Sequence, residues 1–295
     1  SGGRLWFRRA VLPHAPTWNV VAEAGDPDAE RTVVVVAHHD AAHWSLLFAP
    51  HVPRFFGDRF PEQLEKSDTT PPVMFPVFGA PLLVALGGLT GWRWLRRLGA
   101  IVSFGAATTF AEIGSRSTVP GANDNLSGVA TILGLARVLR DKPVAGIRVL
   151  LVSTGSEESF MEGMQAFAKR HFPSLPPDRT HVICVDTVGS PELMQLEGEG
   201  MLVMRDYPED FKDLVSAAAA DAGVPLIRGL RFRNATDGLI ALKAGYPTVM
   251  LGSVNEYKAP ANYHWPTDTA ENVEYGTIVG CVRVCEGAIR RLAAD

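Results

Sequence analysis

Five short motifs place imidazoles and carboxylates at widely separated points of the chain, in patterns suited to metal chemistry. Asp124 lies between two asparagines in the turn Pro120–Gly128, directly before a helical run that begins near Leu126. The other motifs are His38-His39-Asp40, Glu157-Glu158, Val185-Asp186 and Tyr263-His264. Two His and three carboxylates form a ligand set for two divalent metals, with open positions for water and substrate. We interpret Asp124 as the carboxylate that both metals share.

His38 and Asp40 follow a β-branched run, Thr32–Ala37, that is typical of a central buried strand. Residues two apart at the end of a strand point to the same side, so one side chain can bind a metal while the other orients an imidazole. Alone, this pattern would favour a solvated loop. His39 and His43 are expected to be bystanders.

The adjacent pair Glu157-Glu158 follows another strand-like run, Gly146–Ser153. Adjacent side chains diverge, so one carboxylate can bind a metal while its neighbour faces a water molecule. Two like charges at a metal site also separate in pKa, as a proton acceptor requires. Alone, the pair would indicate a solvated acidic loop, but its place between Asp124 and Asp186 favours catalysis. Asp186 ends the apolar run 181–185, where a carboxylate needs a counter-charge.

The elements that must position these groups alternate between strand-like and helix-like segments, which predicts an α/β fold. Such sheets gather their active sites at the carboxyl ends of the strands, and each motif follows a strand-like run or lies in a loop. The 295 residues suit one large α/β domain, with or without an insertion. The expected strands are 18–22, 32–37, 146–153, 181–185 and 247–251, and the expected helices are 126–139, 160–171, 209–222, 235–244 and 273–292.

Residues 44–118 depart from this pattern and are interpreted as a hydrophobic insertion in the catalytic domain. Residues 70–92 and 98–111 carry no charge, and Arg93-Trp94-Leu95-Arg96-Arg97 separates them. The first run is long enough to span a bilayer, which takes about 20 residues, and the second is marginal. A basic, Trp-bearing turn between apolar runs predicts a membrane hairpin over residues 71–112. The turn would be cytoplasmic and the catalytic domain would lie outside the cytoplasm.

The alternative for the insertion is a hydrophobic helical lid or a dimer surface. Prolines at 71, 72, 76 and 81 and the pair Gly87-Gly88 weaken the membrane interpretation without excluding it. In either case the insertion leaves one metal-ligand loop and returns at the next, so we expect it beside the active site. Packed there, it would restrict substrates to small or amphipathic ones.

Composition excludes several classes of protein. With a net charge of −4 and a pI near 6.1, the chain offers no broad basic face for nucleic acid. Three cysteines cannot build a disulfide framework, and Cys184, Cys281 and Cys285 are all expected in the core. The opening Ser1-Gly2-Gly3 suggests a cloning remnant, and no signal peptide is recognised.

Together, the motifs resemble those of the di-zinc aminopeptidase family, which also contains glutamate carboxypeptidases and glutaminyl cyclases. The similar segments are His38–Asp40, Pro120–Gly128, Glu157-Glu158, Val185-Asp186 and Tyr263–Thr269, in the family's order. They cover most of the chain outside the insertion, and their combination is far more specific than any one of them. The resemblance implies one zinc-peptidase domain over residues 1–295, a three-layer α/β/α fold around a central mixed, mostly parallel sheet.

The resemblance also implies two zinc positions. His38, Asp124 and Asp186 would hold one Zn²⁺, and His264, Glu158 and Asp124 would hold the other. Such mixed oxygen and nitrogen ligands also suit Co²⁺ or Mn²⁺. The peptide bond that follows Asp124 would be cis, as in the family.

Three further residues receive catalytic roles from the resemblance. Glu157 would take a proton from a metal-bridged water and pass it to the leaving amine, Asp40 would orient the first imidazole, and Tyr263 is a candidate donor to the developing oxyanion. The alternative for Tyr263 is a ring that only packs. Thr236-Asp237-Gly238 matches a family segment that usually reads Ser-Asp-His, so a substrate-pocket contact found in relatives is expected to be missing at Gly238.

Three functions are compatible with these motifs. We favour a zinc-dependent aminopeptidase that hydrolyses peptides or aminoacyl amides. A glutaminyl-cyclase-like acyltransferase needs one zinc, bound by an Asp, a Glu and a His, so the presence of both His38 and Asp186 argues against it. A catalytically idle, membrane-anchored scaffold of the same fold would be expected to lack ligands or the base, and none is missing.

Overall fold

The structure is a computed structural model that describes residues 6–294, so the interpretation of Ser1-Gly2-Gly3 falls outside the described residues. Its centre is a six-stranded sheet made of β1 (Val20–Gly25), β2 (Thr32–His38), β3 (Arg148–Thr154), β4 (Thr180–Val185), β5 (Glu192–Gln195) and β9 (Thr248–Val254). The strand order is β1-β3-β2-β4-β9-β5. The four inner strands run parallel, and β1 and β5 pair antiparallel at the two edges. The expected mixed, mostly parallel sheet is confirmed.

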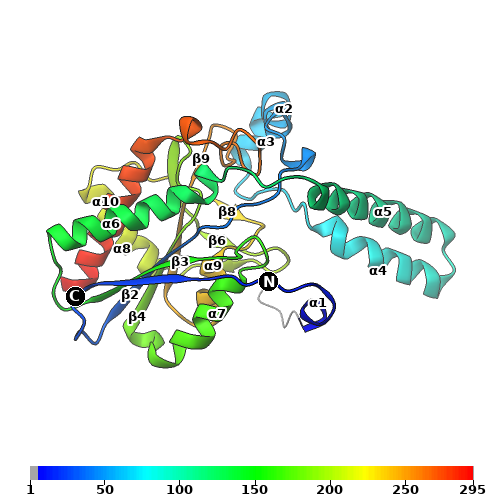
Figure 1. Cartoon of the computed structure of the whole chain (residues 1–295). Helices are drawn as coiled ribbons and strands as arrows, with labels where there is room; N and C mark the ends of the chain where they lie inside the picture. The colour runs from blue at the N-terminus through cyan, green and yellow to red at the C-terminus, as the bar shows by residue number, and fades with distance from the viewer. Residues whose placement is uncertain (1–5, 295) are drawn as a thin grey trace.

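Helices cover both faces of this sheet and complete the three expected layers (Figure 1). The helices on one face are α6 (Ser127–Asp141), α8 (Glu209–Asp221) and α10 (Tyr275–Ala294), and those on the other are α7 (Glu162–His171) and α9 (Asp237–Lys243). In β2, Val33 and Val35 join the first core, whereas Val34 and Val36 join the second. A strand buried on both faces requires a continuous apolar run, which explains the run of valines.

The sequence pattern missed the shortest elements. A second, three-stranded sheet consists of β6 (Gly198–Glu199), β7 (Arg205–Asp206) and β8 (Arg231–Phe232). Two-residue strands show no periodicity, and β5 has only four residues. The first strand was expected at 18–22 but begins at Val20 and pairs as an edge strand. The described chain begins with α1 (Trp6–Val11).

Residues 44–118 leave and rejoin the domain side by side. His43 and Thr118 form a β-bridge, and the N–H of Val119 donates to Ala42 O at 2.9 Å. Between these crossing points lie a short 3-10 turn (Leu46–Phe48), α2 (His51–Arg59), α3 (Pro61–Lys66), α4 (Phe75–Thr90) and α5 (Arg93–Ser115). The insertion therefore has a base at the domain, formed by its entry and exit segments, and a distal part.

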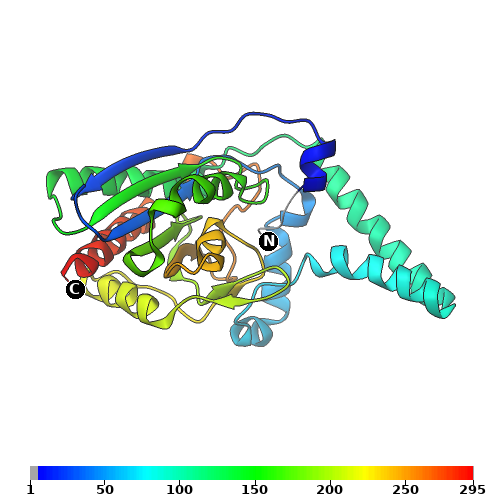
Figure 2. The same cartoon turned by 90° about the horizontal axis from the view of Figure 1, so that it is seen from below.

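The distal part is a hairpin of α4 and α5 that extends away from the sheet and its covering helices (Figures 1 and 2). Its helix lengths correct the expectation from sequence: α4 has 16 residues and α5 has 23. The basic segment 93–97 is the first turn of α5 and not a loop, so the second helix gains the length. Within residues 6–294, α5 is the helix that is long and apolar enough to cross a membrane. The expectation that the insertion lies beside the site holds for its base, not for the hairpin.

Candidate metal centre

The residues expected to bind metal all lie at the carboxyl-terminal edge of the parallel strands. His38 is the last residue of β2, Glu158 follows β3, and Asp186 follows β4. Asp124 lies in the turn before α6, and His264 lies in the loop after β9. This is the edge at which open α/β sheets bind their ligands.

Asp124 is central to the site because its two oxygens face different imidazoles. His38 Nε2 lies 3.2 Å from Asp124 Oδ1, and His264 Nε2 lies 3.1 Å from Asp124 Oδ2. A second carboxylate accompanies each imidazole. Asp186 Oδ1 lies 3.9 Å from His38 Nε2, and Glu158 Oε1 lies 3.2 Å from His264 Nε2. Two groups of three side chains thus share Asp124.

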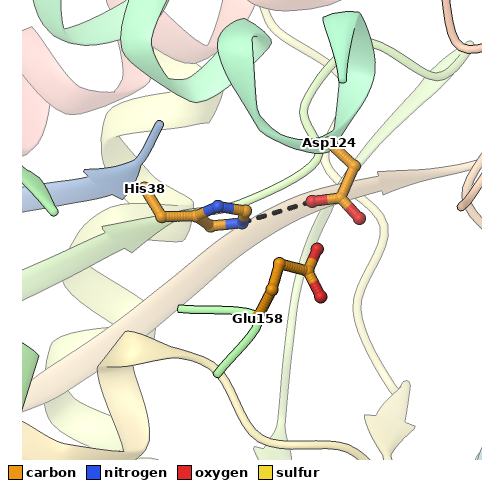
Figure 3. A group of neighbouring side chains, drawn as sticks. All are labelled: His38, Asp124 and Glu158. Carbon is orange, nitrogen blue, oxygen red and sulfur yellow. Dashed lines mark ion pairs between the residues drawn. The ribbon is translucent and has the colours of Figure 1, made fainter. Parts of the chain in front are cut away.

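The spacing and chemistry of these side chains fit zinc. Bonds of about 2.0–2.2 Å to a tetrahedral zinc ion place neighbouring ligand atoms about 3.3–3.6 Å apart, and imidazole and carboxylate are ligands that zinc takes in proteins. Three of the four separations above, at 3.1–3.2 Å, lie within about 0.1–0.2 Å of the lower end of that range. In Figure 3, His38, Asp124 and Glu158 converge, and one ligand atom from each lies within 4.8 Å of the others.

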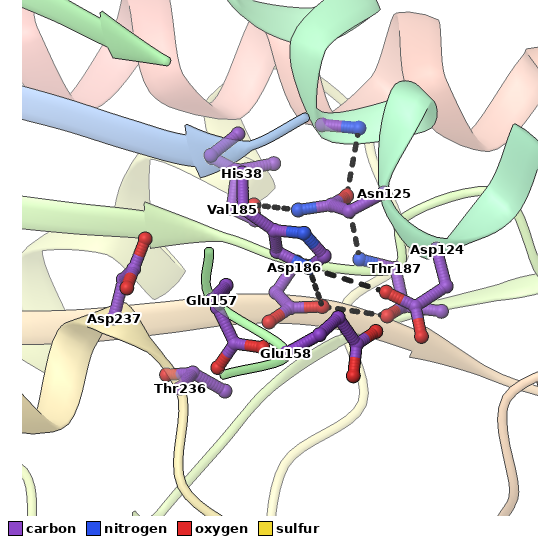
Figure 4. A network of polar contacts seen from close by, with 12 residues as sticks. His38, Asp124, Asn125, Glu157, Glu158, Val185, Asp186, Thr187, Thr236 and Asp237 are labelled. Carbon is purple, nitrogen blue, oxygen red and sulfur yellow. Dashed lines mark hydrogen bonds and ion pairs between the residues drawn. The ribbon is translucent and has the colours of Figure 1, made fainter. Parts of the chain in front are cut away.

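Asn125 ties the Asp124 turn to the end of β4. Its Nδ2 donates to Val185 O at 2.9 Å, and its Oδ1 accepts from the N–H of Thr187 at 3.0 Å (Figure 4). The Thr187 hydroxyl in turn donates to Asp186 Oδ1 at 2.6 Å. The peptide bond between Asp124 and Asn125 is cis, as expected. These contacts fix two of the ligands relative to each other.

Asp268 holds the same turn from the other side, and the sequence interpretation gave it no role. Its carboxylate accepts from the N–H of Asn123 at 2.6 Å and from the N–H of Asp124 at 3.1 Å. Asp268 is buried, four residues after His264, so it joins two ligand loops. An acidic residue close to a ligand loop was the available signal, but its partner turn lies far away in the sequence.

Asp40 connects His38 to the acidic pair. His38 Nδ1 lies 3.1 Å from the backbone carbonyl of Asp40 and 3.5 Å from its Oδ1. The same carboxylate accepts from the N–H of Glu157 at 3.0 Å and of Glu158 at 3.1 Å. The second contact, to the glutamate loop, was not anticipated from the sequence, and it places the loop against the end of β2.

Charge is concentrated at this edge, and it shifts several pKa values. Burial lowers the pKa of His264, but Glu158 and Asp124 outweigh this effect and raise its pKa to about 10. Burial raises the pKa of Asp186 to about 6 even though His38 opposes it. The pKa of Asp124 is lowered despite burial, because both imidazoles hydrogen-bond its carboxylate. The carboxylates thus need positive charge beside them.

The two side chains expected to act on substrate lie beside these ligands. Burial raises the pKa of Glu157 well above its ordinary value, against the opposing charge of His38, and Glu158 and Asp186 add to the increase. Glu157 lies near Asp186 and Glu158 in Figure 4. The Tyr263 ring stacks on the His264 ring with centroids 3.8 Å apart. Burial raises the pKa of the Tyr263 hydroxyl well above 10, so it keeps its proton.

Gly238, where the resemblance leads us to expect a histidine in relatives, lies in a closed environment. An added Cβ at Gly238 would meet Cys184 Cβ at 3.0 Å and the Tyr207 hydroxyl at 3.1 Å. The neighbouring Asp237 is buried and accepts from the Thr154 hydroxyl. A histidine at position 238 would require Cys184 or Tyr207 to move.

Comparison with known proteins agrees with this architecture. The family model described as "Peptidase family M28" matches residues 109–289. Among curated proteins, no sequence matches the chain.

Several solved structures are similar to the fold. A leucine aminopeptidase precursor from Bacteroides thetaiotaomicron has a TM-score of 0.59 and 16% identity, over 92% of this chain and 76% of that one. A glutaminyl cyclase from the same organism, bound to N-acetylhistamine, has a TM-score of 0.61 and 16% identity, over 93% and 77%. An aminopeptidase from Aneurinibacillus sp. strain AM-1 has a TM-score of 0.52 and 17% identity, over 94% of this chain, which spans 47% of that protein.

Proposed function

The chain belongs to peptidase family M28, and we propose that it is a zinc-dependent metallopeptidase of the aminopeptidase type, which hydrolyses peptide or aminoacyl-amide bonds. The observation that carries the proposal is that the two oxygens of Asp124 face separate imidazole–carboxylate pairs. A carboxylate placed in this way suits a two-metal hydrolytic site. We assign one Zn²⁺ to His38, Asp124 and Asp186 and the other to His264, Glu158 and Asp124, and Co²⁺ or Mn²⁺ would suit the same donors.

Zinc bound to these residues would polarise the scissile carbonyl and lower the pKa of a water molecule. Glu157 is assigned as the base that takes the proton from the attacking water and gives it to the leaving nitrogen. Asp40 supports this role because its carboxylate holds the backbone of Glu157 while it also contacts His38. Tyr263 is assigned as a hydrogen-bond donor to the oxyanion, because its hydroxyl is protonated beside a ligand.

Two other functions remain as alternatives. A glutaminyl-cyclase-like acyltransferase would use one zinc ion, and the approach of His38 to both Asp124 and Asp186 favours two. A catalytically idle scaffold is disfavoured because no ligand and no base of the expected set is lost.

The test is zinc content per chain, measured together with hydrolysis of a panel of aminoacyl amides by the wild type and Glu157→Gln. Two zinc ions, with hydrolysis abolished by the substitution while zinc stays bound, would support the proposal. One zinc ion with cyclisation of an N-terminal glutaminyl peptide would replace it with acyl transfer. A protein that binds no zinc and hydrolyses nothing would be a scaffold.

We propose in addition that residues 44–118 are an insertion that associates with membranes through residues 71–112, with the catalytic domain outside the cytoplasm. The large apolar side chains of the hairpin point outward, and Leu82, Leu89, Ile101 and Phe104 are 69–87% exposed. Arg93, Arg96 and Arg97 follow the turn at the far end from the catalytic domain. Basic residues at that end favour the cytoplasmic side for the turn.

Membrane fractionation and protease treatment of intact cells would test this location. The catalytic domain should sediment with membranes and be cleaved from outside. A domain protected in intact cells but cleaved after lysis would reverse the orientation, and a fully soluble one would contradict membrane association.

A further inference from the structure

The base of the insertion touches the loop that carries His264 at two places. At the first, the Arg116 guanidinium lies 4.1 Å from the ring centroid of Trp44, and the Trp44 ring packs edge-on against Trp265 at 5.7 Å. Trp265 is the residue directly after His264. One contact path therefore runs from the end of α5 to a candidate metal ligand.

The second path begins one helical turn earlier, at Glu112. Its Oε2 accepts from the Ser45 hydroxyl at 2.6 Å, and Ser45 is fully buried. The Ser45 oxygen also accepts from the N–H of Leu47 and so caps the short 3-10 turn that holds Phe48. The Phe48 ring packs edge-on against the His264 ring with centroids 4.7 Å apart.

The two paths are joined at their origin. Arg116 Nε lies 2.6 Å from Glu112 Oε1, an ion pair between residues four apart. Arg116 also presents its backbone carbonyl to His43 Nδ1 at 2.5 Å. The end of α5 is thus fixed to the entry segment of the insertion by the Ser45 hydroxyl, the Trp44 ring and the His43 imidazole.

His264 needs such support more than His38 does. Its backbone has a φ of 47°, in the left-handed region that residues other than glycine rarely adopt. A residue in that region persists only when its surroundings hold it there, at a cost of order 1–3 kcal/mol. His38, by contrast, ends a regular strand and has Asp40 on its Nδ1 side.

We propose that Glu112 and Arg116 are positioning residues for His264, which act through Phe48 and Trp44. This inference rests on the proposed metal-dependent hydrolysis. Because α5 runs unbroken from the tip of the hairpin to this turn, whatever holds the hairpin also influences the His264 metal position. Membrane engagement of the hairpin would then steady the ligand loop.

The first test uses metal-free protein, so that it does not depend on activity. In Glu112→Gln, the backbone amides of residues 263–265 should exchange with deuterium about five- to tenfold faster, as expected when a charge-assisted hydrogen bond is weakened. Glu286→Gln is the matched control, because Glu286 pairs with Arg290 at the same spacing, at 2.8 Å, in α10. Equal exchange in the Glu112 variant and wild type would overturn the proposal.

The second test follows the metal. At limiting free zinc, Glu112→Gln should lose zinc from one position, with a lower kcat, an unchanged KM and an unchanged Tm of the metal-free protein. Arg116→Gln should also lose zinc from one position. Arg116→Lys should recover part of that zinc binding, because it keeps a cation over Trp44. If a Glu112 variant fails to fold, Phe48→Leu tests the same path at its other end. If exchange is faster in Glu112→Gln but neither the wild type nor any variant hydrolyses the amides, the positioning role of Glu112 would stand and the proposed hydrolase activity would be refuted.

Discussion

The two imidazoles of the site are held differently, and each should control one metal position. His38→Gln and His264→Gln should each reduce zinc from two ions to one per chain, because Asp124 keeps the imidazole and the carboxylate on its other side. Loss of a residue that only supports a metal ligand costs up to about 100-fold in activity. Loss of a ligand itself should therefore reduce the rate of hydrolysis by at least about 100-fold. Elemental analysis after dialysis against buffered zinc measures the first effect and amide hydrolysis the second.

His39→Gln is the matched control for this pair, since His39 is adjacent but its Nδ1 lies 2.8 Å from the Ser153 hydroxyl on the exposed side. It should retain both ions. A His38 variant that keeps the zinc content of the wild type would show that His38 binds no metal and would favour the single-zinc site of an acyltransferase.

Two buried carboxyl groups outside the ligand set should make the stability of the zinc-free protein depend on pH. Burial raises the pKa of Asp237 to about 7 and that of Glu199 to about 7. Both folded-state values exceed the unfolded values of about 4, so their stabilising contribution is complete below pH 4 and is lost as pH rises through 7. The free energy of unfolding should therefore fall between pH 4 and pH 8.

Urea unfolding of zinc-free protein across this range is the measurement. Asp237→Asn stays neutral and should flatten the profile, whereas Asp178→Asn, at a side chain 77% exposed, should leave it unchanged. A profile that is as steep in Asp237→Asn as in the wild type would mean that Asp237 does not contribute.

At the scale of elements, the pattern of apolar residues predicted those strands and helices whose burial can be read from their own sequence. The valines of β2 specify burial on both faces and therefore a central parallel strand. The two-residue strands of the small sheet could not be predicted, because they exist only through pairing with distant segments. Likewise, each ligand motif was visible in sequence, whereas the supports from Asp268 and Phe48 depend on contacts across the fold.

The hairpin depends on glycines that allow its helices to approach closely. A Cβ at Gly99 would lie 2.7 Å from Ala80 O, whereas one at Gly105 on the same helix would meet no atom within 4 Å. Gly99→Val should separate α4 from α5 and expose the segment 93–97 to trypsin, because close packing through small residues is lost. Gly105→Val carries the same helix-propensity change and should leave cleavage as in the wild type.

Limited proteolysis in mild detergent would measure this difference. Equal cleavage of both variants would mean that backbone approach at Gly99 does not hold the hairpin together.

For the whole molecule, the net charge does not show where the basic residues lie. The chain carries −4 overall, yet Arg93, Arg96 and Arg97 are gathered beyond a charge-free stretch at the end of the hairpin. Trp92 and Trp94 stack beside them, with ring centroids 6.4 Å apart. Basic and Trp side chains together are typical of a membrane interface, so the tip should select anionic lipid where the molecule as a whole would be repelled.

Co-sedimentation with vesicles of phosphatidylcholine, with and without phosphatidylserine, tests this selection. Each basic residue near an anionic surface contributes about 1 kcal/mol, so Arg93→Gln with Arg96→Gln should weaken binding to anionic vesicles about thirtyfold. The pair Arg137→Gln with Arg140→Gln has the same spacing and similar exposure on α6 and should change nothing. An equal loss of vesicle binding in both double variants would mean that the overall charge of the protein, and not the tip of the hairpin, determines binding. A chain that ignores vesicles and sediments as a dimer would instead assign the apolar faces of the hairpin to a second copy, because those exposed side chains must then be covered by protein.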